Sequence, residues 1–312
     1  MKKTIILLST IFCFIILMSC SNEDKNMLQD NSAKEVKFTV ANFLHDNIAT
    51  RTFIKLPDNI LGNTAFRWED NDTIGIIPTI GSQIYFTVSR GAQTDEAGFD
   101  GGAWNMKTDN SIKYAAYYPF VHGHNLDRAR MEVDYTGQNF EPCKDHELTS
   151  ISKYDYMISQ PRNTQGTRYI LFEFKHINSL VEFQFSLPTG TKIKKIDVST
   201  QDKAKVFALR GSYDIDQAID GNININVDEQ DKTNVFTVKT DNVEAINDSI
   251  SVFCMMPPTD LSGKKVVIDV TTADDTKTTI ECANKPKNMV SGKWYTLADQ
   301  KMLDNLNSLL KS

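Results

Sequence analysis

Short runs of alternating apolar and polar residues recur along most of this 312-residue chain, and they constrain its fold more than any other feature. In the clearest run, residues 181–187, apolar residues at the odd positions alternate with Glu182, Gln184 and Ser186. A period of two residues is typical of a β-strand that buries one face, so we expect the odd-numbered side chains to be buried. The apolar pattern is interrupted just before this run, at residues 176–178, and we predict a bend there with His176 as a hydrogen-bonded bend residue.

Comparable runs extend from Val36 to Leu297, with polar turns between them about every 8 to 12 residues. This spacing predicts an all-β fold of the sandwich type, and the length of the chain suits two domains. The polar stretch at residues 162–168 is the best candidate for a boundary. We therefore expect one β-sandwich over residues 34–165 and a second over residues 166–300.

The last residues of the chain, 301–312, have a different pattern. Their apolar residues recur at helical spacing, which predicts a short amphipathic helix. At this length the helix is marginal in isolation and needs a surface to pack against. The apolar residues are Met302, Leu303, Leu306, Leu309 and Leu310.

The N-terminus has the features of a processed leader. Lys2 and Lys3 precede an apolar run at residues 5–18, which is too short to span a ~30 Å hydrocarbon core. The run ends in Leu17-Met18-Ser19-Cys20, which resembles the lipobox of bacterial lipoproteins. We predict a signal peptide over residues 1–19, lipidation of Cys20 and a polar flexible tether over residues 20–33, which would anchor the protein to a membrane. An ordinary secretory signal is the alternative.

The residues after Cys20 bear on localisation. No aspartate follows the cysteine directly, and the sequence Ser21-Asn22-Glu23-Asp24-Lys25 resembles the acidic tether of lipoproteins that reach the outer face of the outer membrane. We therefore expect the protein to be lipid-anchored in the outer membrane and exposed at the cell surface.

Charge and cysteine content exclude some classes of function. The formal net charge is −6, and basic residues are interspersed with acidic ones, which argues against nucleic acid as a partner. Beyond Cys20 the chain contains Cys143, Cys254 and Cys282, an odd number that predicts no disulfide framework. Cys254 and Cys282 both lie in strand-like runs and could pair, although we favour buried free thiols.

The sequence contains no nucleophile elbow, metalloprotease motif, phosphate-binding glycine loop or recognisable pair of catalytic carboxylates, so we expect neither an enzyme nor a cofactor. His122, His124, Cys143 and His146 are residue types that bind zinc or copper. Gly123 lies between the first two histidines in a turn-like segment, however, and we favour solvated loop histidines over a metal site.

Aromatic residues suggest both a core and a binding surface. We expect Trp68, Tyr117 and Tyr118 to fill the N-terminal core. Trp104 follows Gly101 and Gly102, so it is the tryptophan that we expect to be exposed and able to stack on a sugar ring.

Several short segments, taken in order, resemble the fimbrillin family, the lipoprotein precursors of type V pili and their surface relatives. The resemblance implies two β-sandwich domains of transthyretin-like topology and a structural role without catalysis. One departure is Asn71, where the family more often has glycine. The segments are Val36-Lys37-Phe38, Thr50-Arg51, residues 68–76, residues 114–120, Phe174-Lys175-His176 with Val181-Glu182-Phe183, and Gly292-Lys293-Trp294-Tyr295.

The resemblance also implies a route to assembly. In the family a trypsin-like protease is thought to cut after an arginine beyond the first strand, and a strand of another subunit then takes the vacated place. Here the candidate bond is Arg51-Thr52, and the removable strand is the run containing Val36, Phe38 and Val40. The alternative is that Arg51 is a solvated turn residue and the first strand stays in place. The helical tail is not an obvious donor strand.

These observations favour a non-enzymatic surface lipoprotein that serves as a structural or accessory pilus subunit or adhesin, with other pilus subunits, a host molecule or a glycan as partners. One alternative is a glycan-binding surface lipoprotein of a polysaccharide uptake system. A secreted enzyme or inhibitor on the same scaffold is the third interpretation.

Overall fold

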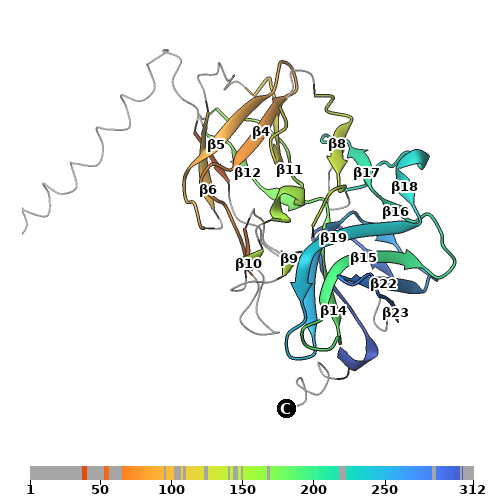
Figure 1. The fold of residues 1–312 in the computed structure, drawn as a ribbon. Helices are drawn as coiled ribbons and strands as arrows, with labels where there is room; N and C mark the ends of the chain where they lie inside the picture. The colour runs from red at the N-terminus through yellow and green to blue at the C-terminus, as the bar shows by residue number, and fades with distance from the viewer. Residues whose placement is uncertain are drawn as a thin grey trace, which may run out of the picture. The chain divides into compact units, whose positions relative to one another are not determined.

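The computed structural model describes residues 37–40, 53–55, 65–94, 96–101, 107, 110–122, 126–139, 141–142, 147–148, 150–166, 169–217, 223–282, 286–302 and 304. These residues belong to one compact unit, Glu35–Gly102 and Met106–Ser312. Their regular structure is almost entirely β (Figure 1), which confirms the predicted fold class.

An eight-stranded sheet contains most of the N-terminal strands. In spatial order it consists of β12 (Leu171–Phe172), β1 (Lys37–Val40), β6 (Ala97–Gly101), β5 (Ile84–Arg90), β4 (Thr73–Pro78), β7 (Tyr114–Tyr118), β11 (Met157–Arg162) and β13 (Phe174–His176). Neighbouring strands are antiparallel except for β1 and β12, which are parallel. A three-stranded sheet comprises β10 (Glu147–Leu148), β2 (Phe53–Lys55) and β3 (Ala65–Arg67).

Buried aromatic residues hold the eight-stranded sheet together, as predicted. Trp68, Tyr117 and Tyr118 are all buried. The turn that follows Trp68 places Asn71 at a φ of 74°, in the left-handed region. Asparagine tolerates this conformation better than most residues other than glycine, so the substitution at this position is compatible with the same turn.

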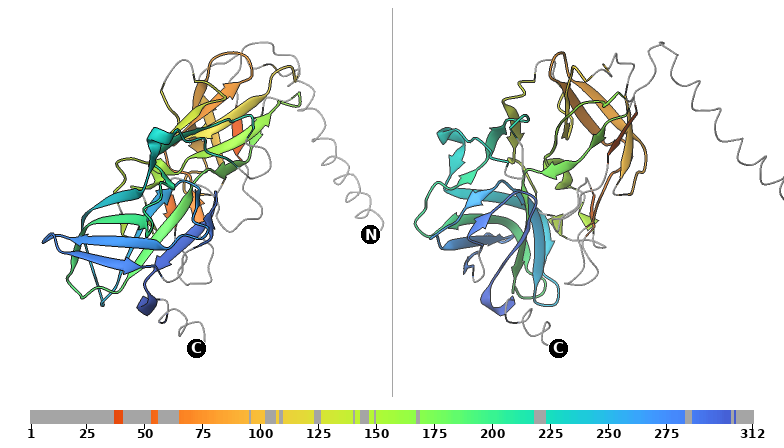
Figure 2. Two further views of the ribbon diagram at one scale, coloured as in Figure 1. Left: turned by 90° about the vertical axis from the view of Figure 1, so that its right-hand side faces the viewer. Right: turned by 180° about the vertical axis from the view of Figure 1, so that it is seen from behind.

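Two four-stranded sheets contain most of the C-terminal strands. One consists of β25 (Trp294–Ala298), β14 (Ser179–Phe185), β20 (Ile250–Met256) and β9 (Glu141–Pro142). The other consists of β19 (Val235–Glu244), β15 (Lys192–Thr200), β22 (Val266–Thr272) and β23 (Lys277–Glu281). Both views of Figure 2 show these green-to-blue strands lying together, and apolar side chains of both sheets share one core cluster.

The predicted register of β14 is confirmed. The odd-numbered residues Val181, Phe183, Phe185 and Leu187 are buried, and the bend at residues 176–178 separates β13 from β14. The polar face is not fully solvated as expected, however, because Glu182 is only 5% exposed. At Glu182 the polar face of β14 is therefore covered by other parts of the protein as well.

The shorter elements complete the structure. They are the pairs β8 (Met131–Asp134) with β17 (Arg210–Tyr213), β16 (Phe207–Ala208) with β18 (Lys232–Thr233) and β21 (Thr259–Asp260) with β24 (Asn288–Met289), and the 3₁₀ helices η1 (Ser152–Tyr154) and η2 (Glu229–Asp231).

Strands on either side of the expected domain boundary pair with one another. β8 and β9 precede residue 165 but pair with β17 and β20, whereas β12 and β13 follow it and join the eight-stranded sheet. The chain passes from that sheet to the C-terminal sheets between His176 and Ser179. The division into domains at 34–165 and 166–300 stays a prediction.

Cys254 and Cys282 are both buried, as we favoured, and they do not form a disulfide with each other. Burial raises the pKa of the Cys254 thiol. Residues 300–302 and 304 are helical, where the tail helix was expected to begin, and residues 305–312 lie outside the described part of the chain. None of the described helices has the length and apolar character of a membrane span.

Candidate functional site

The strand β1 has a ladder on each of its two sides. On one side Lys37, Phe38, Thr39 and Val40 are antiparallel partners of residues in β6. On the other side Thr39 and Val40 are parallel partners of residues in β12. β1 is thus an internal strand of the sheet, although it lies near the beginning of the chain.

β12, the neighbour of β1 on the second side, is held in place through its connection to β13. β12 and β13 are separated in sequence only by Glu173, and β13 pairs with β11 at the other end of the eight-strand order. One continuous segment, residues 171–176, therefore pairs with strands at both ends of the sheet. β1 fills the position between this segment and β6.

An aromatic cluster lies around this position. The ring of Trp68 meets Phe99 of β6 edge to face at a centroid distance of 4.8 Å, and it meets Phe174 of β13 and Tyr118 of β7 at 5.6 Å each. Such pairs contribute ~0.5–1.5 kcal/mol each beyond the area they bury. Because the cluster joins β6, which pairs with β1, to β7 and β13, it favours retention of the framework around β1.

This arrangement has a defined chemical consequence. If β1 departed, backbone N–H and C=O groups of β6 and β12 would lose their ladder partners, and unpaired edges of this kind recruit other strands. An incoming extended segment can restore the hydrogen bonds, which is the physical basis of strand addition. The position of β1 is therefore the candidate functional site.

The residues predicted for processing and anchoring cannot be placed in this geometry. Cys20, Arg51, Thr52 and Trp104 all lie outside the described residues. In the sequence the bond Arg51-Thr52 follows β1 and precedes β2, which begins at Phe53.

The possible metal ligands do not form a site in the described part of the chain. His122 is exposed, and His124, Cys143 and His146 lie outside that part. No group of three or more histidine, cysteine or acidic side chains that could hold a metal occurs among the described residues.

The predicted role of His176 in the bend is confirmed. Its Nδ1 lies 2.6 Å from Oδ1 of the buried Asp155, and the same oxygen accepts a hydrogen bond from Asn178 Nδ2 at 3.2 Å. Asn178 Oδ1 in turn accepts from the backbone N–H of Tyr156 at 2.9 Å. The bend between β13 and β14 is thus fixed by a buried polar group that sequence analysis did not identify, because Asp155 is 21 residues away from His176.

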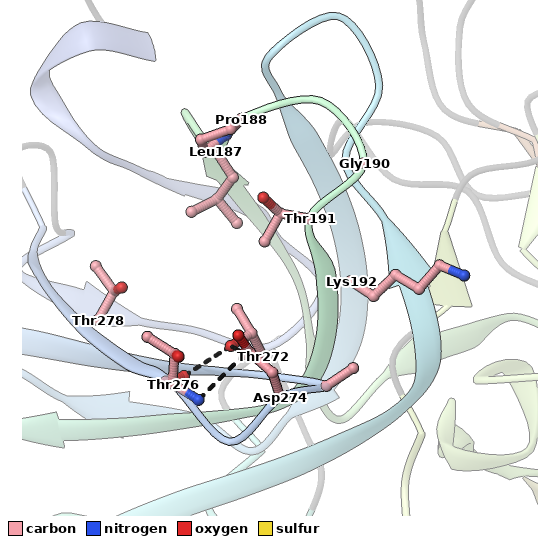
Figure 3. A pocket seen from close by; sticks show the side chains of 10 residues that line it. Leu187, Pro188, Gly190, Thr191, Lys192, Thr272, Asp274, Thr276 and Thr278 are labelled. Atoms are coloured by element: carbon pink, nitrogen blue, oxygen red, sulfur yellow. Dashed lines mark hydrogen bonds between the residues drawn. The ribbon is translucent and has the colours of Figure 1, made fainter.

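A surface hollow of 470 Å³ lies beside the turn between β22 and β23, and the side chains of Leu187, Thr191, Thr272 and Thr276 line it (Figure 3). The polar groups of this hollow form hydrogen bonds within the turn. Thr272 Oγ1 donates to the Thr276 carbonyl at 2.9 Å, and Asp274 Oδ1 accepts from the Thr276 backbone N–H at 3.3 Å. We therefore do not place the functional site there.

The sequence of this chain matches a known protein family. The profile of a family described as fimbrillin-like matches residues 58–299, which is more than half of the chain. Among curated proteins, none matches significantly.

Three solved structures that match this chain come from two Bacteroides species and from Porphyromonas gingivalis. A candidate cell adhesion protein from Bacteroides ovatus has a TM-score of 0.51 and 14% identity over 86% of this chain and 93% of its own. One from Bacteroides uniformis has a TM-score of 0.49 and 16% identity over 76% and 89%. The tip fimbrial protein Mfa3 from Porphyromonas gingivalis has a TM-score of 0.32 and 9% identity over 85% and 94%. At these identities the first of the three supports the fold alone.

Proposed function

Because the chain belongs to the fimbrillin-like family, we propose that it is a non-enzymatic cell-surface lipoprotein that acts as a pilus subunit or adhesin. We further propose that it assembles by exchanging β1 for a strand of another subunit. The observation that supports exchange most strongly is the position of β1 between β6 and β12 in the eight-stranded sheet.

Anchoring comes first in this proposal. Cys20 would carry the lipid, and residues 20–33 would serve as the tether to the outer membrane. With a net charge of −6 and no basic segment, the chain has little attraction for anionic phosphates, so lipid rather than charge would provide the attachment.

Processing at Arg51-Thr52 would release β1 from its covalent link to β2. The four residues of β1 would then be held only by non-covalent contacts. Each ladder hydrogen bond contributes a net ~0.5–1.5 kcal/mol, so a four-residue strand is replaceable by a longer donor. The framework would survive the exchange because residues 171–176 are held by β11.

A reversible lock tests this mechanism. Lys37 and Asp100 are directly opposite one another in β1 and β6, and opposite residues have Cβ atoms ~4.5–5.5 Å apart. In a Cys143→Ser background, the variant Lys37→Cys with Asp100→Cys should form a disulfide that retains β1 after trypsin cleavage.

The locked protein should be cleaved but remain monomeric, and reduction should restore oligomer formation by the same sample. The single variant Lys37→Cys is the control and should assemble without reduction. Assembly of the oxidised double variant, with the disulfide intact, would contradict exchange of β1.

A further inference from the structure

A second surface hollow, of 510 Å³, lies beside β12, on the end of β11 and the segment that follows it. Its volume falls in the ~300–1,000 Å³ range of small-molecule sites. Its lining includes Lys113, Gln160, Arg162, Asn163, Gln165 and Tyr169.

The apolar part of this hollow is exposed to an unusual degree. Tyr169 is 57% exposed and Leu171 is 42% exposed, whereas Ile170 between them is buried. The buried residue fixes the segment to the core, and its neighbours present apolar surface to solvent. A tyrosine ring in such a position packs well against the C–H face of a sugar ring.

The polar part of the hollow consists of planar groups. Gln160, Asn163 and Gln165 carry amides, each with donors and acceptors, and Arg162 carries a guanidinium with five N–H donors. Neighbouring hydroxyls of a pyranose match such groups because both partners present two hydrogen-bonding atoms side by side.

The side chains of Asn163 and Arg162 are already oriented by other groups of the protein. Asn163 Oδ1 accepts a hydrogen bond from the backbone N–H of Gln165 at 3.2 Å, and Arg162 forms an ion pair with Glu173. A side chain that is held before the ligand arrives loses less conformational entropy on binding.

The charge of the lining selects among sugars. Lys113 and Arg162 are the basic side chains among the described residues of the lining, and because Glu173 already pairs with Arg162, the attraction for a ligand anion comes mainly from Lys113. A ligand with a carboxylate would gain from this charge, and a neutral sugar would not.

From these features we infer that the hollow binds a saccharide that bears a carboxylate, such as a uronic or sialic acid residue. Tyr169 supports the sugar ring, the amides bind its hydroxyls, and the Lys113 ammonium attracts the carboxylate. This goes beyond subunit assembly and gives the adhesin a ligand class. It does not depend on removal of β1, because the hollow is formed in the uncleaved protein.

Another exposed aromatic group lacks these properties and provides a control. Tyr85 is 54% exposed and lies beside Phe120 at a ring-centroid distance of 5.4 Å. The nearby amide of Gln83 is occupied, since its Nε2 donates to the Val121 carbonyl at 3.0 Å and its Oε1 accepts from the Tyr117 hydroxyl at 2.5 Å.

Isothermal titration of the uncleaved protein, residues 21–312, tests the inference. The probes are trigalacturonic acid with its methyl ester, and 3′-sialyllactose with lactose. At least one acidic probe should bind more tightly than its neutral counterpart, and added salt should weaken the binding. Tyr169→Ala should reduce affinity about tenfold and Lys113→Gln should reduce the preference for the acidic probe, whereas Tyr85→Ala should change neither.

Thermal unfolding of each variant should match that of the parent, since these side chains are exposed. The inference is overturned if no acidic probe binds at millimolar concentration, if acidic and neutral probes bind equally, or if Tyr85→Ala weakens binding as much as Tyr169→Ala. None of these results bears on assembly, which is measured separately by oligomer formation.

Discussion

Thr39 of β1 and Leu171 of β12 are parallel register partners, although their positions in the chain differ by 132 residues. On its other side Thr39 is the antiparallel partner of Gly98 in β6. The first strand is therefore enclosed by two strands that are also held without it, because β6 pairs with β5 and β12 continues into β13, which pairs with β11. This is the relationship that makes replacement of β1 physically reasonable.

The anchor leads to the first prediction. Cys20→Ala should abolish metabolic labelling by a palmitate analogue and leave unprocessed precursor, because the lipid thioether requires a cysteine thiol. Labelled protein is detected by gel fluorescence after immunoprecipitation. Cys143→Ala is the control and should label normally. Persistent labelling of Cys20→Ala would refute the lipoprotein assignment.

The buried carboxylate of Glu182 leads to the second prediction. Its Oε1 accepts from Ser251 Oγ at 2.6 Å in β20, and its Oε2 accepts from Thr296 Oγ1 at 3.0 Å in β25. Glu182→Ala should lower the free energy of unfolding by ~3–6 kcal/mol, because each of these two hydrogen bonds to a charged group contributes ~1.5–3 kcal/mol. Urea denaturation measures the loss. A change of the size expected for an exposed residue would contradict the bridging role of Glu182.

The Asp155 carboxylate leads to the third prediction. It is buried against His176 Nδ1 and Asn178 Nδ2, so Asp155→Ala should destabilise the protein by ~3–5 kcal/mol in urea denaturation. Asp228→Ala removes the exposed ion pair with Arg130 and serves as the matched control, with an expected change under ~1 kcal/mol. Equal effects of the two variants would show that burial of the first pair has no energetic role.

Acid sensitivity is the fourth prediction. The Lys264 ammonium and the Thr200 hydroxyl lower the pKa of Asp202 to about 2. The unfolded chain, with an aspartate pKa of ~3.9, binds the proton first as pH falls, so this contribution is present above ~pH 4 and is lost toward pH 2. Unfolding free energies measured from pH 5 to pH 2 should decline less steeply for Asp202→Asn than for the parent. Parallel curves would contradict the assignment.

Local sequence patterns predicted those parts of the fold that depend on local periodicity. The alternation at Val181, Phe183 and Phe185 predicted the buried face of β14. The interruption of the apolar pattern at residues 176–178 predicted the bend at His176. The burial of Glu182 was not predictable in the same way, because its partners Ser251 and Thr296 lie 69 and 114 residues away.

The candidate site was predictable only in part. The run around Phe38 indicated a first strand, and the family resemblance implied that it could be removed. Its enclosure by β6 and β12 depends on long-range pairing that no local pattern reports. Sequence analysis also did not identify the sugar-binding hollow, because it named Trp104 as the aromatic residue that could stack on a sugar ring. Tyr169 next to a polar Asn-Thr-Gln segment was the available signal.

The central claim is that removal of β1 opens a position that a strand of another subunit then fills. Limited trypsinolysis of folded residues 21–312, followed by native mass spectrometry across a concentration series, tests this most directly. We predict cleavage at Arg51 ahead of the lysines and ahead of Arg67 and Arg90, which lie in strands. Loss of the peptide that contains β1 and growth of oligomers with concentration should follow. Arg51→Ala should lose cleavage at this bond and should remain monomeric. A trimmed product that keeps the peptide bound and stays monomeric at every concentration would contradict the claim.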